Sequence, residues 1–276
     1  MKILIMTDME GCAGILNFKD WVEPAGRYYE KGRRFLTNET NAAIDGFFTG
    51  GATEVVVLDG HGYGGIDPEF LDERALFRHG HSEKVWPWGL DKTFAAIAFT
   101  GQHAKAGTPY SHLTHTDWPN VIDYRINDLS VGEYGQLALC AMELGVPTIL
   151  ACGEKALCEE AEALTPGVVT VAVKTGLLPD DGFRNSTMEE YEAAKLSALH
   201  ISPSKAMKLI HENALKAINK LKEEPCSFHY PTLSPPYRSM VEYRAYSAKN
   251  TAPCTKTAKH PSSIIKLLNT PLENVN

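Results

Sequence analysis

Residues 2–14 read KILIMTDMEGCAG, a short apolar run followed by two carboxylates. Residues 3–6 are apolar, bounded and rich in β-branched side chains, a pattern typical of a buried strand in a parallel sheet. Asp8 and Glu10 follow where this strand should end. Ligands of open α/β sheets lie outside the carboxyl ends of the strands, and alternation places both carboxylates on one face, so the pattern predicts a cation site. The alternative is a turn or helix cap at Asp8 and a solvated Glu10.

The composition excludes several classes of protein. A chain of 276 residues is long enough for one large α/β domain or two smaller ones. Its formal net charge of −7 leaves no basic surplus to neutralise phosphates, so we expect no nucleic-acid partner and no anionic membrane surface. The apolar run at residues 3–6 is too short for a signal peptide, and no run approaches the roughly 18 residues of a membrane span.

The six cysteines indicate the compartment. They form no Cys-x-x-Cys pair, which argues against a zinc ribbon and against a disulfide-rich mini-domain. Cys140, for example, lies between leucine and alanine, where a free cysteine behaves as a small core residue. We therefore expect a soluble protein of the reducing cytoplasm.

Predicted strands and helices alternate along most of the chain. After the first strand we expect a helix within 25–51, strands at 54–58 and 94–100, a hairpin at 121–131, a helix at 134–144, a strand at 147–151, a helix at 154–164, a strand at 168–173 and a helix beginning at Ser202-Pro203. Residues 109–119 and 177–187 are predicted loops, the second a possible lid. This alternation favours an α/β fold with a mostly parallel central sheet flanked by helices.

The pattern weakens towards the C-terminus. Beyond residue 224 only a strand at 240–245 and a short helix at 262–268 stand out among several prolines. We therefore expect a metal-binding α/β catalytic domain over residues 1–224. Residues 225–276 would form a smaller, less regular strand and helix segment packed on the same domain.

Five candidate metal ligands are expected at one edge of the sheet, namely Asp8, Glu10, His61, His103 and Glu133. The two histidines each follow a predicted strand, and Glu133 begins a helix. Carboxylate and imidazole suit zinc or a similar divalent ion, and five ligands exceed what one tetrahedral zinc uses. A two-metal site, with the ions about 3.5–4 Å apart and Asp8 or Glu10 as the bridge, is the simplest account. Taken singly, each residue could instead be a cap, a turn residue or a histidine bonded to the backbone.

Several ordered motifs carry a resemblance to a known family. They are Thr7-Asp8-Met9-Glu10-Gly11, Asp59-Gly60-His61, Gly101-Gln102-His103-Ala104, Gly107-Thr108-Pro109 with His115, and Ile126-Asn127-Asp128 followed by Gly132-Glu133; weaker matches are Gly153-Glu154, Ala172-Val173-Lys174 and Ile201-Ser202-Pro203. With these motifs the sequence resembles the DppA-type zinc-dependent D-aminopeptidases, peptidase family M55, over roughly its first 220 residues.

The resemblance implies a site and an activity. It implies two zinc ions per chain on Asp8, Glu10, His61, His103 and Glu133, with Asp8 as the bridge and a catalytic histidine at position 115. It also implies release of N-terminal D-amino acids from short peptides of the D-Ala-D-Ala type. The assembly implied is a homo-oligomer, a decameric ring.

The chain departs from the family pattern in ways that leave alternatives open. Thr7 and Gly60 stand where serine is expected, and one extra residue in the loop at 109–115 makes His112 a rival for the catalytic role of His115. We predict His115, because its distance to the motif at 126–128 fits the family without a gap. The segment 175–198 is enlarged, and roughly the last 50 residues match poorly.

Other roles also stay open at this stage. Asp59 is interpreted as a carboxylate that orients His61, with a turn-forming role as the alternative. For the whole protein, the other functions are a metal-dependent amidase or deacylase on another small amide, and a non-catalytic metal- or peptide-binding protein.

Overall fold

Strand β1 (Lys2–Thr7) lies inside a sheet, as its apolar run predicts. In the computed structural model, which describes residues 1–80, 84–179 and 182–275, β1 pairs in parallel with β2 (Glu54–Asp59) on one side and β4 (Ala96–Gln102) on the other. The described strands of this sheet follow the order β3-β2-β1-β4-β7-β8-β9. Its remaining members are β3 (Leu76–Arg78), β7 (Thr148–Glu154), β8 (Val169–Gly176) and β9 (Ala198–His200), of which β9 alone is antiparallel to its neighbour.

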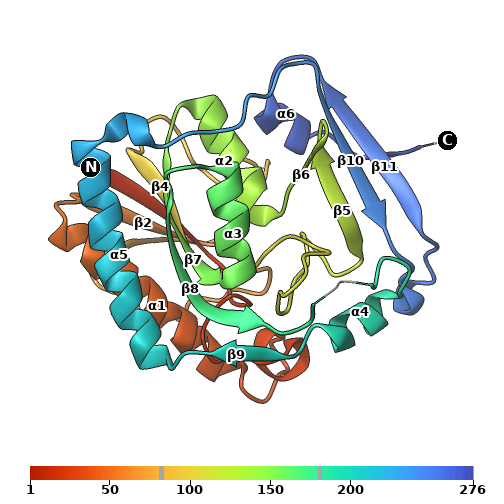
Figure 1. Cartoon of the computed structure of the whole chain (residues 1–276), viewed down its shortest axis with the longest axis horizontal. Helices are drawn as coiled ribbons and strands as arrows, with labels where there is room; N and C mark the ends of the chain where they lie inside the picture. The colour runs from red at the N-terminus through yellow and green to blue at the C-terminus, as the bar shows by residue number, and fades with distance from the viewer. Residues whose placement is uncertain (81–83, 180–181, 276) are drawn as a thin grey trace.

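Helices cover both faces of this sheet (Figure 1). Ile3 and Ile5 point to one face, where they share a core with helices α1 (Tyr29–Thr49) and α5 (Pro203–Glu223). Leu4 and Met6 point to the other, where they share a core with α2 (Glu133–Leu144) and α3 (Lys155–Leu164). A strand buried on both faces is what a parallel sheet requires. The predicted fold class is confirmed.

A second, smaller sheet lies beside the first. It has the order β12-β11-β10-β5-β6 and is antiparallel, formed by β5 (Val121–Ile126), β6 (Leu129–Ser130), β10 (Tyr237–Tyr243), β11 (Cys254–His260) and β12 (Glu273–Asn274). Helix α6 (Ile264–Leu268) packs against α2 and shares a core with this sheet. Because β10 pairs with β5, segments before and after residue 224 share one sheet. A domain boundary at that residue stays a prediction.

Most predicted elements are confirmed within a few residues, including the hairpin at 121–131. The sequence reading missed β3, β9, β11 and β12, helix α4 (Met188–Ala194), the π-helix η1 (Phe18–Val22), and two 3-10 turns, η2 (Pro225–Ser227) and η3 (Ser247–Lys249). Part of the predicted lid, residues 180–181, lies outside the described residues. All six cysteines are free. None of the helices in the described part of the chain has the length and apolarity needed to cross a membrane.

The contact between α1 and α5 depends on a glycine. A Cβ atom added at Gly46 would lie 2.5 Å from the backbone oxygen of His211 and 2.8 Å from Cβ of Ala214. We expect Gly46→Ala to lower the free energy of unfolding by up to about 2 kcal/mol, because overpacking costs about 1–3 kcal/mol and alanine regains roughly 1 kcal/mol of helix propensity. Urea denaturation measures the change. Gly62→Ala is the control, since its Cβ would meet no atom within 4 Å; equal stability of the two variants would contradict the prediction.

Candidate metal centre

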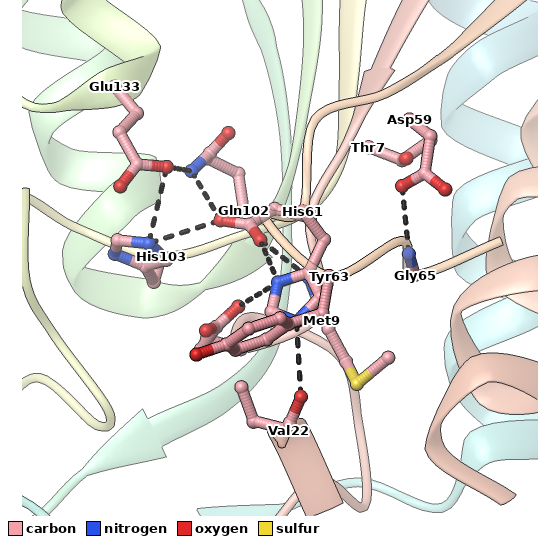
Figure 2. A network of polar contacts seen from close by, with 12 residues as sticks. Thr7, Met9, Val22, Asp59, His61, Tyr63, Gly65, Gln102, His103 and Glu133 are labelled. Carbon is pink, nitrogen blue, oxygen red and sulfur yellow. Dashed lines mark hydrogen bonds and ion pairs between the residues drawn. The ribbon is translucent and has the colours of Figure 1, made fainter. Parts of the chain in front are cut away.

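The parallel register of the first sheet brings the candidate ligands together. Thr7 is level with Asp59 of β2 and with Thr100 of β4, so the three strands end side by side. Asp8 and Glu10 follow β1, and His61 and His103 follow the other two strands. Glu133 reaches the same edge as the first residue of α2. Figure 2 shows His103 beside Glu133 and Gln102, with His61 close by.

Asp8 lies between the two histidines. Its Oδ1 is 3.2 Å from Nδ1 of His61, and its Oδ2 is 3.1 Å from Nε2 of His103. Glu10 lies on the His61 side, with Oε2 3.3 Å from Nδ1. Glu133 lies on the other side, with Oε2 3.5 Å from Nε2 of His103. The two oxygens of one buried carboxylate therefore face two separate pairs of ligands.

Backbone carbonyl groups orient the imidazole rings. His61 Nε2 lies 3.2 Å from the carbonyl oxygen of Val22 in η1, and His103 Nδ1 lies 2.9 Å from that of Ala104. His115 Nδ1 lies 3.0 Å from the carbonyl oxygen of its neighbour Leu113. A ring nitrogen that donates to a carbonyl carries the proton, so the other nitrogen presents its lone pair to the cluster.

The donor atoms fit a shared cation. Within the described residues, Glu10 Oε2 and His103 Nε2 are buried and make no hydrogen bond, although charged neighbours lie within 3.3 Å. Buried polar atoms without a hydrogen bond are uncommon and often mark a bound ion. Ligand atoms of two overlapping groups lie within 4.8 Å of one another: Asp8, Glu10 and His103, and His103, His115 and Glu133. Carboxylate and imidazole together are a zinc donor set.

The charges in the cluster shift its pKa values in opposite directions. Burial alone would raise the pKa of Asp8, but the close imidazole groups of His103 and His61 outweigh burial and hold the pKa of Asp8 well below its usual range. Burial alone would lower the pKa values of both histidines, but Glu10, Glu133 and Asp8 raise them well above the usual value. The carboxylates therefore strongly favour a positive charge at this edge, from a proton or from a metal ion.

His115, not its rival, lies at the cluster. The His115 ring stacks on that of His103 with 4.1 Å between centroids, and its Nε2 is 3.7 Å from Oε1 of Glu133. His112 is fully buried away from the ligands, with its ring edge against His200 at 5.3 Å. Burial lowers the pKa of His112 to about 2. The catalytic role of His115 stays a prediction, now with a position that suits it.

Asp59 does not orient His61. Its Oδ1 accepts a hydrogen bond from the backbone N–H of Gly65 at 2.8 Å, and its Oδ2 accepts one from Ile66 at 3.3 Å. Asp59 therefore stabilises the glycine-rich turn after β2, and the carbonyl of Val22 orients His61 instead. The turn-forming alternative for Asp59 is the correct one.

The sequence reading missed two polar residues at the centre. Gln102 donates from Nε2 to Oδ2 of Asp8 at 3.0 Å and to Oε2 of Glu133 at 3.4 Å, which ties two candidate ligands together. The sequence contains a signal for this role, because Gln102 lies within the family motif Gly101-Gln102-His103-Ala104 and directly precedes a candidate ligand. Asp117 donates a hydrogen bond from its backbone N–H to Oε1 of Glu133 at 2.9 Å, and its φ is 60°. No local sequence pattern predicts this contact.

A cavity of about 1140 Å³ opens onto the centre. Its lining includes four of the candidate ligands, Asp8, Glu10, His61 and Glu133, together with His115. Many aromatic side chains also line it: Phe18, Tyr63, Trp86, Trp88, Trp118, Tyr124, Tyr243 and Tyr246. Residues 268–272 form part of the wall, and the acidic Glu23, Glu189 and Glu192 form another part. Burial, together with the charges of Glu23 and Glu189, raises the pKa of Glu192 to about 7. The cavity is somewhat larger than the roughly 300–1,000 Å³ of a typical small-molecule site and has room for a short peptide.

Three comparisons relate the chain to known proteins. A family model, Peptidase_M55, described as D-aminopeptidase, matches residues 1–264. A D-aminopeptidase of Bacillus subtilis (strain 168) is 33% identical over 254 residues, which covers 89% of this chain and 82% of the relative. The chain is also similar to a solved structure described as the Zn-dependent D-aminopeptidase DppA from Bacillus subtilis, a self-compartmentalizing protease. The TM-score is 0.77 and the sequence identity is 30%, over 89% of this chain and 82% of that chain.

The raised histidine pKa values predict that zinc binding depends on pH. A zinc ligand must be a neutral imidazole, so a metal ion has to displace the protons that His61 and His103 bind more tightly than usual. Apparent zinc affinity should fall as the pH falls, and binding should release protons. Calorimetric titration in two buffers of different ionisation enthalpy measures the release. Equal heats in both buffers, and an affinity that does not change with pH, would contradict the prediction.

Proposed function

The chain belongs to the D-aminopeptidase family Peptidase_M55, and on that premise we propose that it is a zinc-dependent aminopeptidase that releases N-terminal D-amino acids from short peptides of the D-Ala-D-Ala type. The observation that carries the proposal is the position of Asp8, whose two oxygens face His61 and His103. The Zn-dependence of the similar DppA structure supports zinc as the metal.

Two zinc ions per chain would divide the ligands. His61 and Glu10 would bind one ion and His103 and Glu133 the other, with Asp8 as the bridge; this follows the pairing of the distances. When bound, such ions polarise the scissile carbonyl and lower the pKa of the attacking water. Gln102 would fix the positions of the Asp8 and Glu133 carboxylates relative to each other, because its side-chain NH₂ group donates to both.

His115 would move the proton. Because its Nδ1 donates to the carbonyl of Leu113, its Nε2 is free to accept a proton from the attacking water and return it to the leaving amine. The same lone pair could act as a nucleophile towards the carbonyl carbon. The stacked ring of His103 restricts the His115 ring to this orientation.

The assembly and compartment are part of the proposal. The similar DppA structure is described as self-compartmentalizing, so we propose that this chain forms a homo-oligomer, a decameric ring. Six free cysteines, four of them buried, suit the reducing cytoplasm.

Hydrolysis of two dipeptides tests the proposed function. We expect zinc-loaded protein to cleave D-Ala-D-Ala and to leave L-Ala-L-Ala intact, and a chelator to abolish cleavage, with readdition of zinc restoring it. Chromatographic release of free alanine is the measurement. Cleavage of neither dipeptide by protein that still binds zinc would overturn the proposed substrate, and cleavage that survives complete metal removal would overturn the proposed chemistry.

Substitution of His115 tests its role. His115→Ala should lower kcat by about 10²- to 10⁴-fold, because a positioned acid–base group contributes that much. His112→Gln is the matched control, since it changes a neighbouring buried histidine of the same loop that does not reach the cluster. Steady-state kinetics on both variants decide the assignment. Loss of turnover in the His112 variant, with turnover kept in the His115 variant, would reverse it.

A further inference from the structure

Two carboxylates outside the ligand set, the buried Glu154 and the half-buried Glu160, connect the segments that carry the candidate ligands. His103, His115 and Glu133 lie on three separate segments: the end of β4, the loop after it and the start of α2. These segments meet the corner where β7 ends and α3 begins (Figure 1). Glu154 ends β7 and Glu160 lies within α3. Gly153-Glu154 is one of the weaker family motifs in the sequence, and the proposed mechanism gives it no role.

Glu154 joins the His103 segment to the His115 segment. Its side chain is fully buried. Oε1 accepts hydrogen bonds from the backbone N–H of Ala104 at 2.8 Å and from Oγ1 of Thr114 at 3.0 Å, and Oε2 accepts one from the backbone N–H of His112 at 2.6 Å. Ala104 directly follows His103, and Thr114 directly precedes His115. One side chain thus fixes the distance between two histidines whose rings stack.

Glu160 joins the His103 segment to the Glu133 segment. Its Oε2 accepts a hydrogen bond from the backbone N–H of Lys105 at 2.8 Å, and its Oε1 accepts one from Gly132 at 3.3 Å. Gly132 directly precedes Glu133. The two backbones are close here, since a Cβ added at Gly132 would lie 2.8 Å from Cβ of Lys105.

Carboxylates suit this task better than neutral side chains. A carboxylate only accepts, so both oxygens can bind N–H groups from different segments, and charge-assisted hydrogen bonds are about twice as strong as neutral ones. A buried carboxylate is costly unless its hydrogen bonds are made, so its presence fixes the donors in place. Glu154 also lies near the buried ammonium group of Lys174, which donates to the backbone oxygen of Glu10 on the opposite side of the centre.

We propose that Glu154 and Glu160 are positioning residues, a carboxylate clamp that sets His103, His115 and Glu133 at the spacing that one metal ion and the catalytic histidine need. This role rests on the proposed function and adds to it the residues that hold one of the two zinc sites in position. The clamp acts on the His103 and Glu133 side of Asp8, because its hydrogen bonds go to the segments of those residues and of His115. A substitution that removes these hydrogen bonds should therefore weaken zinc binding at the His103 and Glu133 site and leave the His61 and Glu10 site unchanged.

Glutamine substitutions break the clamp with little change in volume. In Glu154→Gln or Glu160→Gln, the new NH₂ group faces a backbone N–H, so at least one segment loses its acceptor. We expect the affinity for one of two zinc ions to fall about 10- to 100-fold, as for other groups that orient metal ligands. kcat should fall while KM for the D-dipeptide changes little. Glu159→Gln is the control on the same helix, since Glu159 is exposed and pairs with Lys155.

Competition with a chromophoric chelator measures the affinity for each zinc ion, and this measurement does not depend on enzymatic activity. The absorption spectrum of the cobalt-substituted protein reports the geometry of the site, which a merely structural change elsewhere would not alter. Thr114→Val is a second variant that removes one donor to Glu154, and it should give a smaller effect of the same kind. It keeps the proposal testable if Glu154→Gln does not fold.

The outcomes separate the clamp from the proposed function. If wild-type protein binds two zinc ions and the glutamine variants bind both as tightly as Glu159→Gln does, with the same kcat and cobalt spectrum, the clamp is refuted and the function stands. A lower melting temperature alone in those variants also refutes it. Failure of wild-type protein to bind zinc would overturn the proposed function and the clamp together.

Discussion

The structure depends on a concentration of buried charge at one edge of a parallel sheet. Asp8, Glu10, His61 and His103 are all less than a tenth exposed, and Glu133 lies beside them. Charges in such a place are unstable unless each has a partner. The parallel register of β1 with β2 and β4 creates the edge, because it brings the carboxyl ends of the three strands side by side. The opposed pKa shifts of Asp8 and the histidines show how strongly these charges depend on one another.

A second set of buried polar side chains lies behind the candidate ligands and holds the loops that carry them. Loops lack the repeated hydrogen bonds of helices and strands, so their backbone N–H groups need other acceptors. Glu39 accepts from Ala13 in the loop after Glu10, and Glu154 accepts from the loops of His103 and His115. Lys174 donates to the carbonyl of Glu10. Rigid loops of this kind satisfy the requirement that catalytic groups be held in place before the substrate arrives.

The sequence predicts that the candidate ligands gather at one edge of the sheet, because the signals for this are local. An apolar run followed at once by Asp8 and Glu10 describes both the strand and its functional end, and the same holds for β2 with His61. Short strands such as β3 and β9 give little pattern, because each has three residues and is partly exposed. Asp117 and the carbonyl of Val22 act through contacts between distant segments, so no local pattern announces them. The sequence does not decide the role of Asp59, because a carboxylate two residues before a histidine suits a turn as well as a ligand support.

The chemistry and the pocket come from different parts of the chain. The candidate ligands follow strands of the first sheet or begin α2, whereas the cavity wall takes Tyr243, Lys256 and residues 268–272 from the second sheet and the segment around α6. Residues from α4 and the neighbouring loop add the acidic wall. Residues from the segments 175–198 and 225–276 therefore supply much of the cavity wall. Because the described residues of these segments include none of the five candidate ligands, substitutions in this wall can change the shape of the pocket while the spacing around Asp8 stays the same.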